Sequence, residues 1–454
     1  MAIETPDLLV IGAGPGGYTA AIRAAQRGAR VTLVSDAPPG GVCLHLGCIP
    51  TKALLASVEA LRTVQRAGDF GLDTASIGAE PRLAADALLR RTRKVTAAMG
   101  KGLEFLFRKN GVQFVSGRAR LLGGGRVQVG DQSLAASRII LATGSRPAPS
   151  PAGLPPVDGQ RIINSNHALH LAEPPKKMLI IGGGYIGCEF ACIFRALGAE
   201  ITVVEALAGL LPGMDAELGV ALAKFFRKAG IEVRVGETVS GFDPSFDRVL
   251  ISVGRMPNTG DLGCDDAGVK LTARGHVEVN ERLETSAAGI YAIGDIVGKF
   301  PLAHVASAQA RVAVANALGG SATMDYTAVP GVVFTHPEVA SVGLSEAEAQ
   351  AQERAVRVGK FPMAALGRAQ ASGETDGFVK LVADAESHKL LGGQVIGPAA
   401  GELIASITLA ISLGATTEQV GHTVFAHPTF AEAIGEAAEA VFGSPVHIFL
   451  PKRA

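Results

Sequence analysis

The sequence is poor in several features whose scarcity narrows the range of functions. It contains no tryptophan, and it has five cysteines in 454 residues. So few cysteines exclude a disulfide-stapled scaffold. The 42 basic and 42 acidic residues cancel to a net charge of zero. A nucleic-acid-binding surface needs a basic excess, so we expect no nucleic-acid partner.

Long uninterrupted apolar runs are also lacking, and none approaches the ~18 residues of a membrane span. The first residues, Met1 to Asp7, show no basic region followed by an apolar core, which is the pattern of a secretory signal. We therefore expect a cytoplasmic location and no membrane partner. In a reducing compartment, a pair of cysteines indicates a metal site or a redox centre rather than a structural disulfide.

An internal repeat dominates what is present. Residues 8–17 (LLVIGAGPGG) match residues 178–187 (MLIIGGGYIG), and residues 28–34 (GARVTLV) match residues 198–204 (GAEITVV). Both pairs are 170 positions apart, so two βαβ units align without a gap. Strand, glycine turn, helix and strand in this order predict an α/β protein with two Rossmann-like dinucleotide-binding domains.

The repeat also suggests how the chain divides. Strand-like runs that end in glycine recur at residues 138–147, 248–257 and 285–295, and the pattern stops near Met324. We predict a first dinucleotide domain over residues 1–147 that resumes over 278–324. A second dinucleotide domain is predicted for 148–277, and a C-terminal domain of different character for 325–454. About three domains suit a chain of this length.

Each glycine turn fits the G-x-G-x-x-G pattern directly after a strand. In this pattern the first glycine makes a tight turn, the second admits a pyrophosphate, and the third allows the helix to pack on the strand. A single match would be weak evidence, but two matches in full βαβ context indicate nucleotide sites. The glycines are Gly12, Gly14 and Gly17 in the first turn and Gly182, Gly184 and Gly187 in the second.

An acid about 20 residues after each turn is expected to bind the ribose. Glu205 fills this place in the second unit, and a carboxylate there favours NAD over NADP because it repels a 2′-phosphate. In the first unit the same offset falls on Ser35, with Asp36 next to it. Either residue could contact the ribose, and we favour Asp36.

The remaining chemistry centres on Cys43 and Cys48, spaced C-x4-C within GGVCLHLGCIPTKALL, residues 40–55. A zinc site would need two further ligands at matched spacing, which the sequence does not offer, so we predict no metal. Cys188 and Cys192 are interpreted as small apolar fillers of a helix face. His422 and His447 are interpreted as ordinary surface or core histidines.

The cysteine segment resembles the active-site segment of the dihydrolipoamide dehydrogenases, members of the pyridine nucleotide-disulfide oxidoreductase family. The resemblance extends along nearly the whole chain. It includes ATGSRP at 142–147, VGRMPNT at 253–259, YAIGD at 291–295, FTHPEVASVGLSE at 334–346 and HPTFAE at 427–432. It implies an FAD domain at 1–147 and 278–324, an NAD domain at 148–277, and a C-terminal α+β dimerisation domain.

The resemblance also implies an activity and partners. Electrons would pass from protein-bound dihydrolipoyl groups to the cysteine pair, then to FAD, and then as hydride to NAD⁺. The partners would be a second copy of the chain and the lipoyl domains and E2 core of a 2-oxo acid dehydrogenase or glycine cleavage complex. Two alternatives stay open: another NAD(P)H-dependent flavin disulfide reductase, such as a glutathione reductase, and a non-catalytic nucleotide-binding sensor.

Individual roles follow from the same resemblance. Cys43 would exchange with the substrate disulfide, and Cys48 would act as a thiolate against the flavin. Lys52 would lie near the flavin and pair with Glu189, while Tyr185 would shield the flavin face. His427 would be the base, oriented by Glu432, with a cis bond to Pro428. The remaining cofactor contacts implied are Ala119, Thr143, Gly144, Gly254, Asp295 and Ala303.

The sequence departs from the family pattern at three places. His45 replaces an asparagine between the cysteines, and Thr51 replaces a serine before Lys52. His45 adds a titratable group beside the redox pair. A β-excursion expected between Gly230 and Gly254 is nearly absent. Either the NAD domain is trimmed or a stretch is missing from the sequence.

Overall fold

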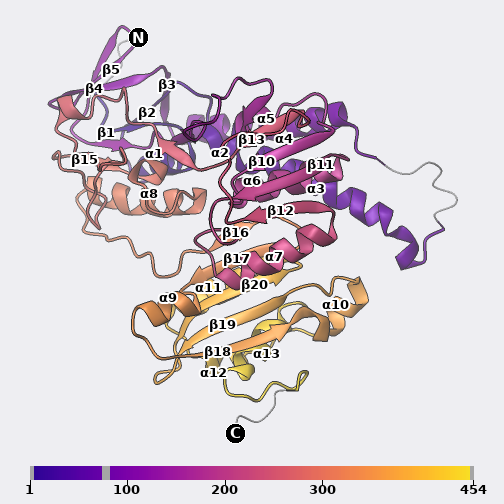
Figure 1. Ribbon diagram of the computed structural model, residues 1–454. Helices are drawn as coiled ribbons and strands as arrows, with labels where there is room; N and C mark the ends of the chain where they lie inside the picture. Colours follow the sequence, from indigo (N-terminus) through magenta and orange to yellow (C-terminus); the bar gives the residue numbers. More distant parts are fainter. Residues whose placement is uncertain (1–4, 74–81, 450–454) are drawn as a thin grey trace. The chain divides into compact units, whose positions relative to one another are not determined.

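The computed structural model describes residues 5–73 and 82–449, and the chain separates into two compact units (Figure 1). The described residues of the first unit come from Met1–Pro149, Asn164–Ala172 and Gly254–Met324. Those of the second come from Ser150–Ile163, Glu173–Val253 and Asp325–Ala454. Each unit is described below by itself.

A parallel sheet forms the centre of the first unit, with strand order β15-β7-β1-β2-β3. Its middle strands are short, uniformly apolar and completely buried, as expected when helices cover both faces. The bounds are β1 Leu8–Ile11, β2 Val31–Ser35, β3 Gln113–Ser116, β7 Ile139–Leu141 and β15 Ile290–Ala292.

Helices α1 and α8 contact each other, and both contribute alanines to the core beside β1. Small side chains at these positions let the helices approach the sheet closely. The helices of the unit are α1 Pro15–Gln26, α2 Gly41–His45, α3 Cys48–Gln65, α4 Ala85–Lys109, α5 Ser165–Ala168 and α8 Ala303–Ala317, with 3-10 turns η1 Ala67–Phe70, η3 Asp265–Ala267 and η4 Gly294–Val297.

Two small antiparallel sheets complete the unit. The first is a three-stranded meander, and the second is a two-stranded ribbon. The meander comprises β4 Ala119–Gly123, β5 Arg126–Val129 and β6 Gln132–Ala135, and the ribbon pairs β8 Ser145–Pro147 with β14 Arg255–Pro257.

The domain boundary predicted at residue 277 differs from the structure, because residues 254–277 belong to the first unit. Leu262, Cys264, Val269 and Val277 are buried in the same cluster as the strands and meander of this unit. The sequence pattern did not assign residues 254–277 to the first unit, because the segment has little regular structure. Its burial there depends on packing against residues far away in the sequence.

The second unit holds a separate sheet with strand order β12-β11-β10-β13-β9, in which β10, β11, β12 and β13 run parallel. It repeats the strand, glycine turn and helix arrangement of the first unit. The elements are β9 Ile162–Asn164, β10 Lys177–Ile181, α6 Tyr185–Ala196, β11 Glu200–Glu205, α7 Ala216–Lys228, β12 Ile231–Val235 and β13 Arg248–Ile251.

The connection from β12 to β13 is short and contains no strand, unlike the equivalent place in the first unit, which carries the meander. Phe242 and Phe246 pack over Ile162 and Val249 at this end of the sheet. The carboxylate of Asp247 accepts hydrogen bonds from the backbone amides of Lys176 and Lys177 at 2.9 and 2.8 Å. The short connection is therefore held against the sheet by these apolar contacts and hydrogen bonds.

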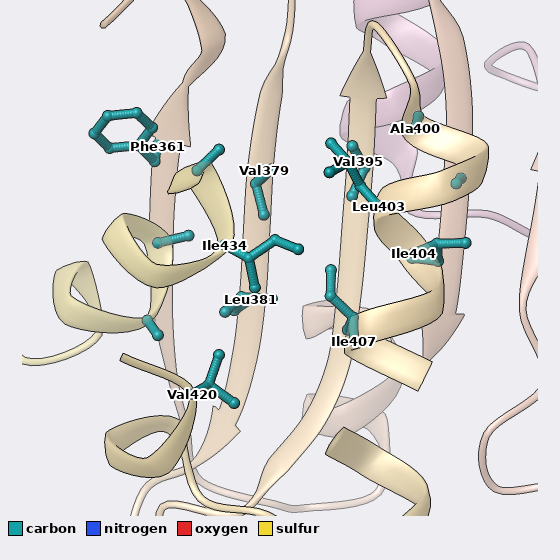
Figure 2. Packing of buried hydrophobic residues seen from close by; sticks show 14 of the residues in the cluster. Phe361, Val379, Leu381, Val395, Ala400, Leu403, Ile404, Ile407, Val420 and Ile434 are labelled. Atoms are coloured by element: carbon teal, nitrogen blue, oxygen red, sulfur yellow. The ribbon is translucent and has the colours of Figure 1, made fainter. Parts of the chain in front are cut away.

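The C-terminal part of the second unit is an antiparallel sheet with order β16-β17-β20-β19-β18. Helices α11 and α13 cover one face, where Ile404, Ile407 and Ile434 meet Leu381 and Val395 (Figure 2). The elements are β16 Gly331–Val333, β17 Glu338–Gly343, α9 Glu346–Ala351, β18 Val356–Pro362, η5 Met363–Ala365, α10 Gly367–Ser372, β19 Phe378–Asp384, β20 Leu390–Gly397, α11 Ala400–Ser412, α12 Thr417–Gly421 and α13 Glu432–Ala440.

Lys380 lies between Val379 and Leu381 on β19, so its side chain points to the opposite face. There it is 7% exposed and forms ion pairs with Asp215, Glu217 and Glu346 at 3.0, 3.2 and 3.3 Å. Asp215 is the N-cap of α7, and Glu346 begins α9. A buried charge cluster thus ties the C-terminal sheet to the nucleotide sheet of the same unit.

One stretch, Gly41–Gln65, has the length and hydropathy of a membrane-spanning helix among the described residues. It is interrupted between α2 and α3 and carries Lys52, Glu59 and Arg62. A core helix passes the same test, so this stretch is weak evidence for a membrane span.

Candidate active site

The first glycine turn connects β1 to α1, and each glycine meets a distinct constraint. Gly12 has φ +104°, and a Cβ there would lie 2.2 Å from the carbonyl oxygen of Ala142. At Gly17 a Cβ would lie 1.7 Å from the carbonyl oxygen of Gly12. A Cβ at Gly14 would have no atom within 4 Å. The open middle position and the uncapped N-terminus of α1 suit a pyrophosphate.

The second turn, between β10 and α6, repeats this geometry. Gly182 has φ +107°, and a Cβ there would lie 2.5 Å from the carbonyl oxygen of Ser252. A Cβ at Gly187 would lie 2.1 Å from the carbonyl oxygen of Gly182, and one at Gly184 would again meet nothing within 4 Å. In both turns, therefore, the first and third glycines allow close packing, and the second leaves free space in which a pyrophosphate could bind.

Glu205 ends β11 beside the second turn and is 8% exposed. One carboxylate oxygen accepts the N–H of Gly183 at 2.7 Å, and the other accepts the N–H of Leu207 at 2.9 Å. These bonds fix the carboxylate beside the turn, where a nucleotide ribose would lie. Its preference for NAD stays a prediction.

In the first unit Ser35 ends β2 and is buried, and its Oγ accepts the N–H of Ala37 at 3.1 Å. Asp36 follows outside the strand and is exposed. Ser35 therefore occupies the strand-end position that Glu205 holds in the second unit. Which of the two contacts a ribose stays open.

A polar cluster surrounds Asp295 in η4. The Oγ of Ser145 donates to the Asp295 carboxylate, and Nε of Arg255 lies 3.8 Å from the same carboxylate. Arg255 also donates to Oγ and to the carbonyl oxygen of Ser145, both at 2.7 Å. Neither Ser145 nor Arg255 was among the predicted site residues. Both could have been found from the sequence, because Ser145 lies in ATGSRP and Arg255 lies in VGRMPNT, two of the motifs that resemble the family.

The predicted cofactor residues Thr143 and Gly144 lie just before β8. Oγ1 of Thr143 donates to the carbonyl oxygen of Asn258, and Nδ2 of Asn258 donates back to the carbonyl oxygen of Thr143, both at 2.9 Å. Gly144 and Gly254 both have positive φ, and a Cβ at either would meet nothing within 4 Å. Each strand of the ribbon is therefore preceded by a glycine with free space beside its Cα.

Two other predicted cofactor residues are the first residues of a helix and of a strand. Ala303 begins α8, whose N-terminus has no side-chain cap and so presents backbone amides. Ala119 begins β4, pairs with Val129, and has its side chain in the core. Any contact from Ala119 to a cofactor would have to come from its backbone, and its role stays a prediction.

The cysteine pair lies where two helices meet. Cys43 is in α2 and Cys48 is the first residue of α3, with Gly47 between the helices. Their side chains are hydrogen-bonded to one another; this bond, together with burial, raises the pKa of Cys43, whereas nearby Lys52 opposes the rise. At the N-terminus of a long helix the macrodipole favours an anion, which suits a thiolate at Cys48.

The residues around the pair are anchored to the backbone. Nε2 of His45 lies 2.9 Å from the carbonyl oxygen of Pro39. Oγ1 of Thr51 donates to the carbonyl oxygen of Gly47 at 2.6 Å, which fixes the junction of α2 and α3. Burial raises the pKa of Tyr18, and negative charge on Cys43 and Cys48 adds to the rise. Tyr18 was not predicted.

Helix α6 carries two predicted residues of the second unit. Tyr185 begins the helix and is 39% exposed. Glu189, one turn later, is 4% exposed, and its Oε1 accepts the N–H of Phe334 at 3.0 Å. Lys52 belongs to the other unit, so its predicted pairing with Glu189 stays a prediction.

The histidine dyad stands at the start of α13. Nδ1 of His427 lies 2.8 Å from Oε1 of Glu432, and Oε2 of Glu432 accepts the N–H of Thr429 at 2.8 Å. The imidazole is 76% exposed, so its other nitrogen is open to a substrate. The His427–Pro428 bond is cis, as predicted.

Two dinucleotide cradles, a redox-competent cysteine pair and an oriented histidine define a nucleotide-dependent dithiol oxidoreductase. Residues 6–310 match the family model of the pyridine nucleotide-disulphide oxidoreductases, and residues 329–438 match the dimerisation domain of that family. The chain belongs to this family. The predicted α/β fold with two dinucleotide-binding domains and a C-terminal domain is thereby confirmed.

Relatives with assigned names cover nearly the whole chain. The dihydrolipoyl dehydrogenase of Chlamydia muridarum is 42% identical over 463 residues, covering 98% of each chain. That of Thermus scotoductus is 42% identical over 467 residues, covering 98% of this chain and 99% of the relative. The resemblance read from the sequence is confirmed.

Solved structures agree on the fold. LpdA from Mycobacterium tuberculosis is 28% identical with a TM-score of 0.87, over 95% of this chain and 99% of that one. The HOCl-induced flavoprotein disulfide reductase RclA from Escherichia coli is 25% identical with a TM-score of 0.84, again over 95% and 99%. The fold is therefore shared by flavoproteins of this type.

Proposed function

We propose that the chain is a dihydrolipoyl dehydrogenase, which oxidises protein-bound dihydrolipoyl groups and reduces NAD⁺. The observation that carries the proposal is the combination of Cys43 and Cys48 at a helix junction with the His427–Glu432 dyad. Full-length relatives named dihydrolipoyl dehydrogenase support it. A nucleotide-binding sensor would need neither the cysteine pair nor the dyad.

The thiol chemistry assigns each group a step. A dihydrolipoyl thiolate attacks Sγ of Cys43 in the Cys43–Cys48 disulfide, and Cys48 leaves as a thiolate. The second dihydrolipoyl sulfur then attacks the sulfur joined to Cys43, which closes the lipoyl disulfide and releases Cys43. His427 takes the substrate proton, because only a thiolate is nucleophilic.

The residues present fit two nucleotide cofactors. The first turn, Asp295 and the start of α8 would hold FAD, and the second turn with Glu205 would hold NAD. When bound, FAD supplies a two-electron acceptor between the dithiol and the nicotinamide. Of the chain's own residues, Glu205 would favour NAD over NADP, and the amides of the two turns would hold the pyrophosphates.

A homodimer is part of this proposal. The C-terminal domain matches a dimerisation domain, and it leaves Leu409, Leu413 and Val424 exposed by 60, 75 and 96%. Apolar side chains this exposed favour a further interface. We propose that His427 serves Cys43 of the second subunit. The lipoyl domains and E2 core of a multienzyme complex are the proposed partners, and the cytoplasm is the proposed location.

One pair of measurements tests the function. The purified holoenzyme should show a flavin absorbance band and reduce NAD⁺ with dihydrolipoamide. It should turn over glutathione disulfide with NADPH at least about a hundredfold more slowly, because the Glu205 carboxylate disfavours the 2′-phosphate of NADPH. Faster turnover of glutathione disulfide than of lipoamide would overturn the assignment in favour of a glutathione reductase.

A further inference from the structure

His45 is the last residue of α2, two positions after Cys43, and its side chain reaches back past the start of that helix. Nε2 of the imidazole lies 2.9 Å from the carbonyl oxygen of Pro39. A carbonyl oxygen only accepts hydrogen bonds, so Nε2 is the donor and carries a hydrogen. The neutral Nε2–H tautomer and the imidazolium ion both carry this hydrogen, so the bond does not depend on the protonation of Nδ1. We call the bond from His45 to Pro39 the α2 clamp.

Helix α2 is too short to be stable by itself. It contains five residues, far fewer than an isolated helix needs in water, so contacts from outside the helix must hold it. At its start, the Leu44 side chain packs so closely on Gly40 that a Cβ there would clash with it. The hydrogen bond from the N–H of Leu44 to the carbonyl oxygen of Gly40 is long, at 3.4 Å. The α2 clamp adds a 2.9 Å bond around the same turn.

The backbone next to Pro39 lies against the first glycine turn. The N–H of Gly40 donates to the carbonyl oxygen of Ala13 at 2.8 Å. A Cβ at Gly41 would lie 2.7 Å from Cα of Gly14, the middle glycine of that turn. The α2 clamp therefore ties the helix to backbone that rests on the proposed FAD cradle.

The second cysteine of the redox pair is held by a different helix. Cys48 begins α3, which has 18 residues, and Oγ1 of Thr51 anchors this helix start to the carbonyl oxygen of Gly47 at 2.6 Å. Loss of the α2 clamp should thus loosen Cys43 and leave Cys48 in place. The pair is in its dithiol form in this structure, with the two side chains hydrogen-bonded, so the clamp is present in the reduced state.

We propose that His45 is a positioning residue that lowers the reduction potential of the Cys43–Cys48 pair. In the oxidised form the disulfide itself restrains α2, so the clamp adds little. In the dithiol form the clamp keeps Cys43 beside Cys48, and it limits the conformational entropy gained when the disulfide opens. It therefore favours the disulfide and makes the pair a weaker oxidant. The inference rests on the redox role of the pair in the proposed function, and not on the identity of the substrate.

The length of the side chain at position 45 should decide whether the clamp forms. Glutamine and asparagine both carry an amide N–H donor. The amide nitrogen of glutamine lies about as far from Cβ as Nε2 of histidine, whereas that of asparagine lies only about as far as Nδ1. His45→Gln should therefore keep the bond to Pro39. His45→Asn, which restores the residue of the family pattern, and His45→Ala should lose it.

The experiment equilibrates each holoenzyme with mixtures of reduced and oxidised dithiothreitol. Each dithiothreitol that closes its ring disulfide gives two electrons to one pair and opens the Cys43–Cys48 disulfide. Acid quenching, alkylation and mass spectrometry of this peptide then give the dithiol fraction. We expect His45→Asn and His45→Ala to favour the dithiol about threefold to tenfold more than the parent, where tenfold corresponds to about 30 mV. His45→Gln should match the parent, as should the control His422→Asn, at an exposed histidine of the other unit.

Parent-like equilibria in His45→Asn and His45→Ala would overturn the inference. An equal shift in His45→Gln would also overturn it, because the effect would then come from loss of the imidazole and not of the bond. The flavin absorbance and the long-wavelength band after NADH should persist in every variant, since Cys48 belongs to α3. Loss of that band in the Asn and Ala variants would show that His45 acts on α3, against the inference. A parent pair that never forms a disulfide would contradict the proposed function itself, which is a different failure.

Discussion

Nδ1 of His427 and Oε1 of Glu432 are 2.8 Å apart, while Oε2 of Glu432 is held by the N–H of Thr429. The carboxylate is thus fixed by the backbone and in turn fixes the imidazole. This arrangement sets the tautomer, with the proton on Nδ1 and the exposed Nε2 left as the base. The orientation is set within one short segment of the chain.

Removing either member of this dyad should therefore impair the dithiol half of the reaction. We expect His427→Gln to lower kcat for dihydrolipoamide oxidation by roughly 10²–10⁴-fold, the range of a lost general base. Glu432→Gln should cost less, because it keeps an acceptor oxygen. Flavin reduction by NADH, followed by stopped flow, should be unchanged. Parent-like turnover by His427→Gln would show that another group takes the proton.

Cys48→Ser should keep FAD but lose lipoamide turnover. Cys48 begins α3, where the helix N-terminus favours a thiolate, and its side chain bonds that of Cys43. The long-wavelength absorbance expected of a thiolate beside the flavin should also disappear after NADH is added. Cys264→Ala, at a buried cysteine of the same unit, is the control and should retain the band. A near-native rate in Cys48→Ser would contradict the assignment.

Glu205 should determine the preference for NAD. Glu205→Ala removes the charge that would repel a 2′-phosphate, so the ratio of kcat/KM for NADH to that for NADPH should fall about tenfold. Glu205→Gln separates charge from structure, because it keeps an acceptor for the Gly183 or Leu207 amide. Glu200→Ala, at the exposed start of the same strand, should leave the ratio unchanged. An unaltered ratio in both Glu205 variants would place the selectivity elsewhere.

Lys380 should matter for stability more than any exposed cation of the same sheet. Lys380→Met leaves the carboxylates of Asp215, Glu217 and Glu346 without their shared buried partner. Breaking a buried ion pair from one side costs about 3 kcal/mol in the free energy of unfolding. Lys360→Met removes a 43% exposed partner of Glu217 and should cost about 1 kcal/mol or less. Equal denaturant midpoints for the two variants would contradict this account.

Local patterns were enough to predict the two nucleotide folds. Apolar runs before Gly12 and Gly182 mark buried parallel strands, and the glycine spacing fixes each turn, because only glycine tolerates the positive φ and close carbonyl contacts found there. The shortened stretch before Gly254 was also visible, and the structure shows it as a strandless connection. In these cases the pattern itself is local, although the carbonyl groups that crowd Gly12 and Gly182 belong to Ala142 and Ser252, far along the chain.

Long-range contacts could not be predicted in this way. Arg255 reaches Ser145 across 110 positions of sequence and Asp295 across 40, and no local pattern shows that these residues meet. Lys380 appears in the sequence as one more charged residue among apolar ones, although it is buried. His447 was interpreted as an ordinary histidine, and its link to Glu436 depends on how the chain turns after α13.

The shared active site can be tested with mixed dimers. A Cys43→Ser subunit lacks the exchanging thiol, and a His427→Gln subunit lacks the base, so each homodimer should be inactive. If the active site is shared as proposed, two-fold symmetry means that each subunit donates its base to the other. A hybrid would then contain one site with both groups native and one site with neither, and about half of the parent activity per dimer should return. Differently tagged subunits, purified through both tags, isolate the hybrid. Hybrids that form but stay inactive would show that His427 serves Cys43 of its own chain, because every site would then lack one of the two groups.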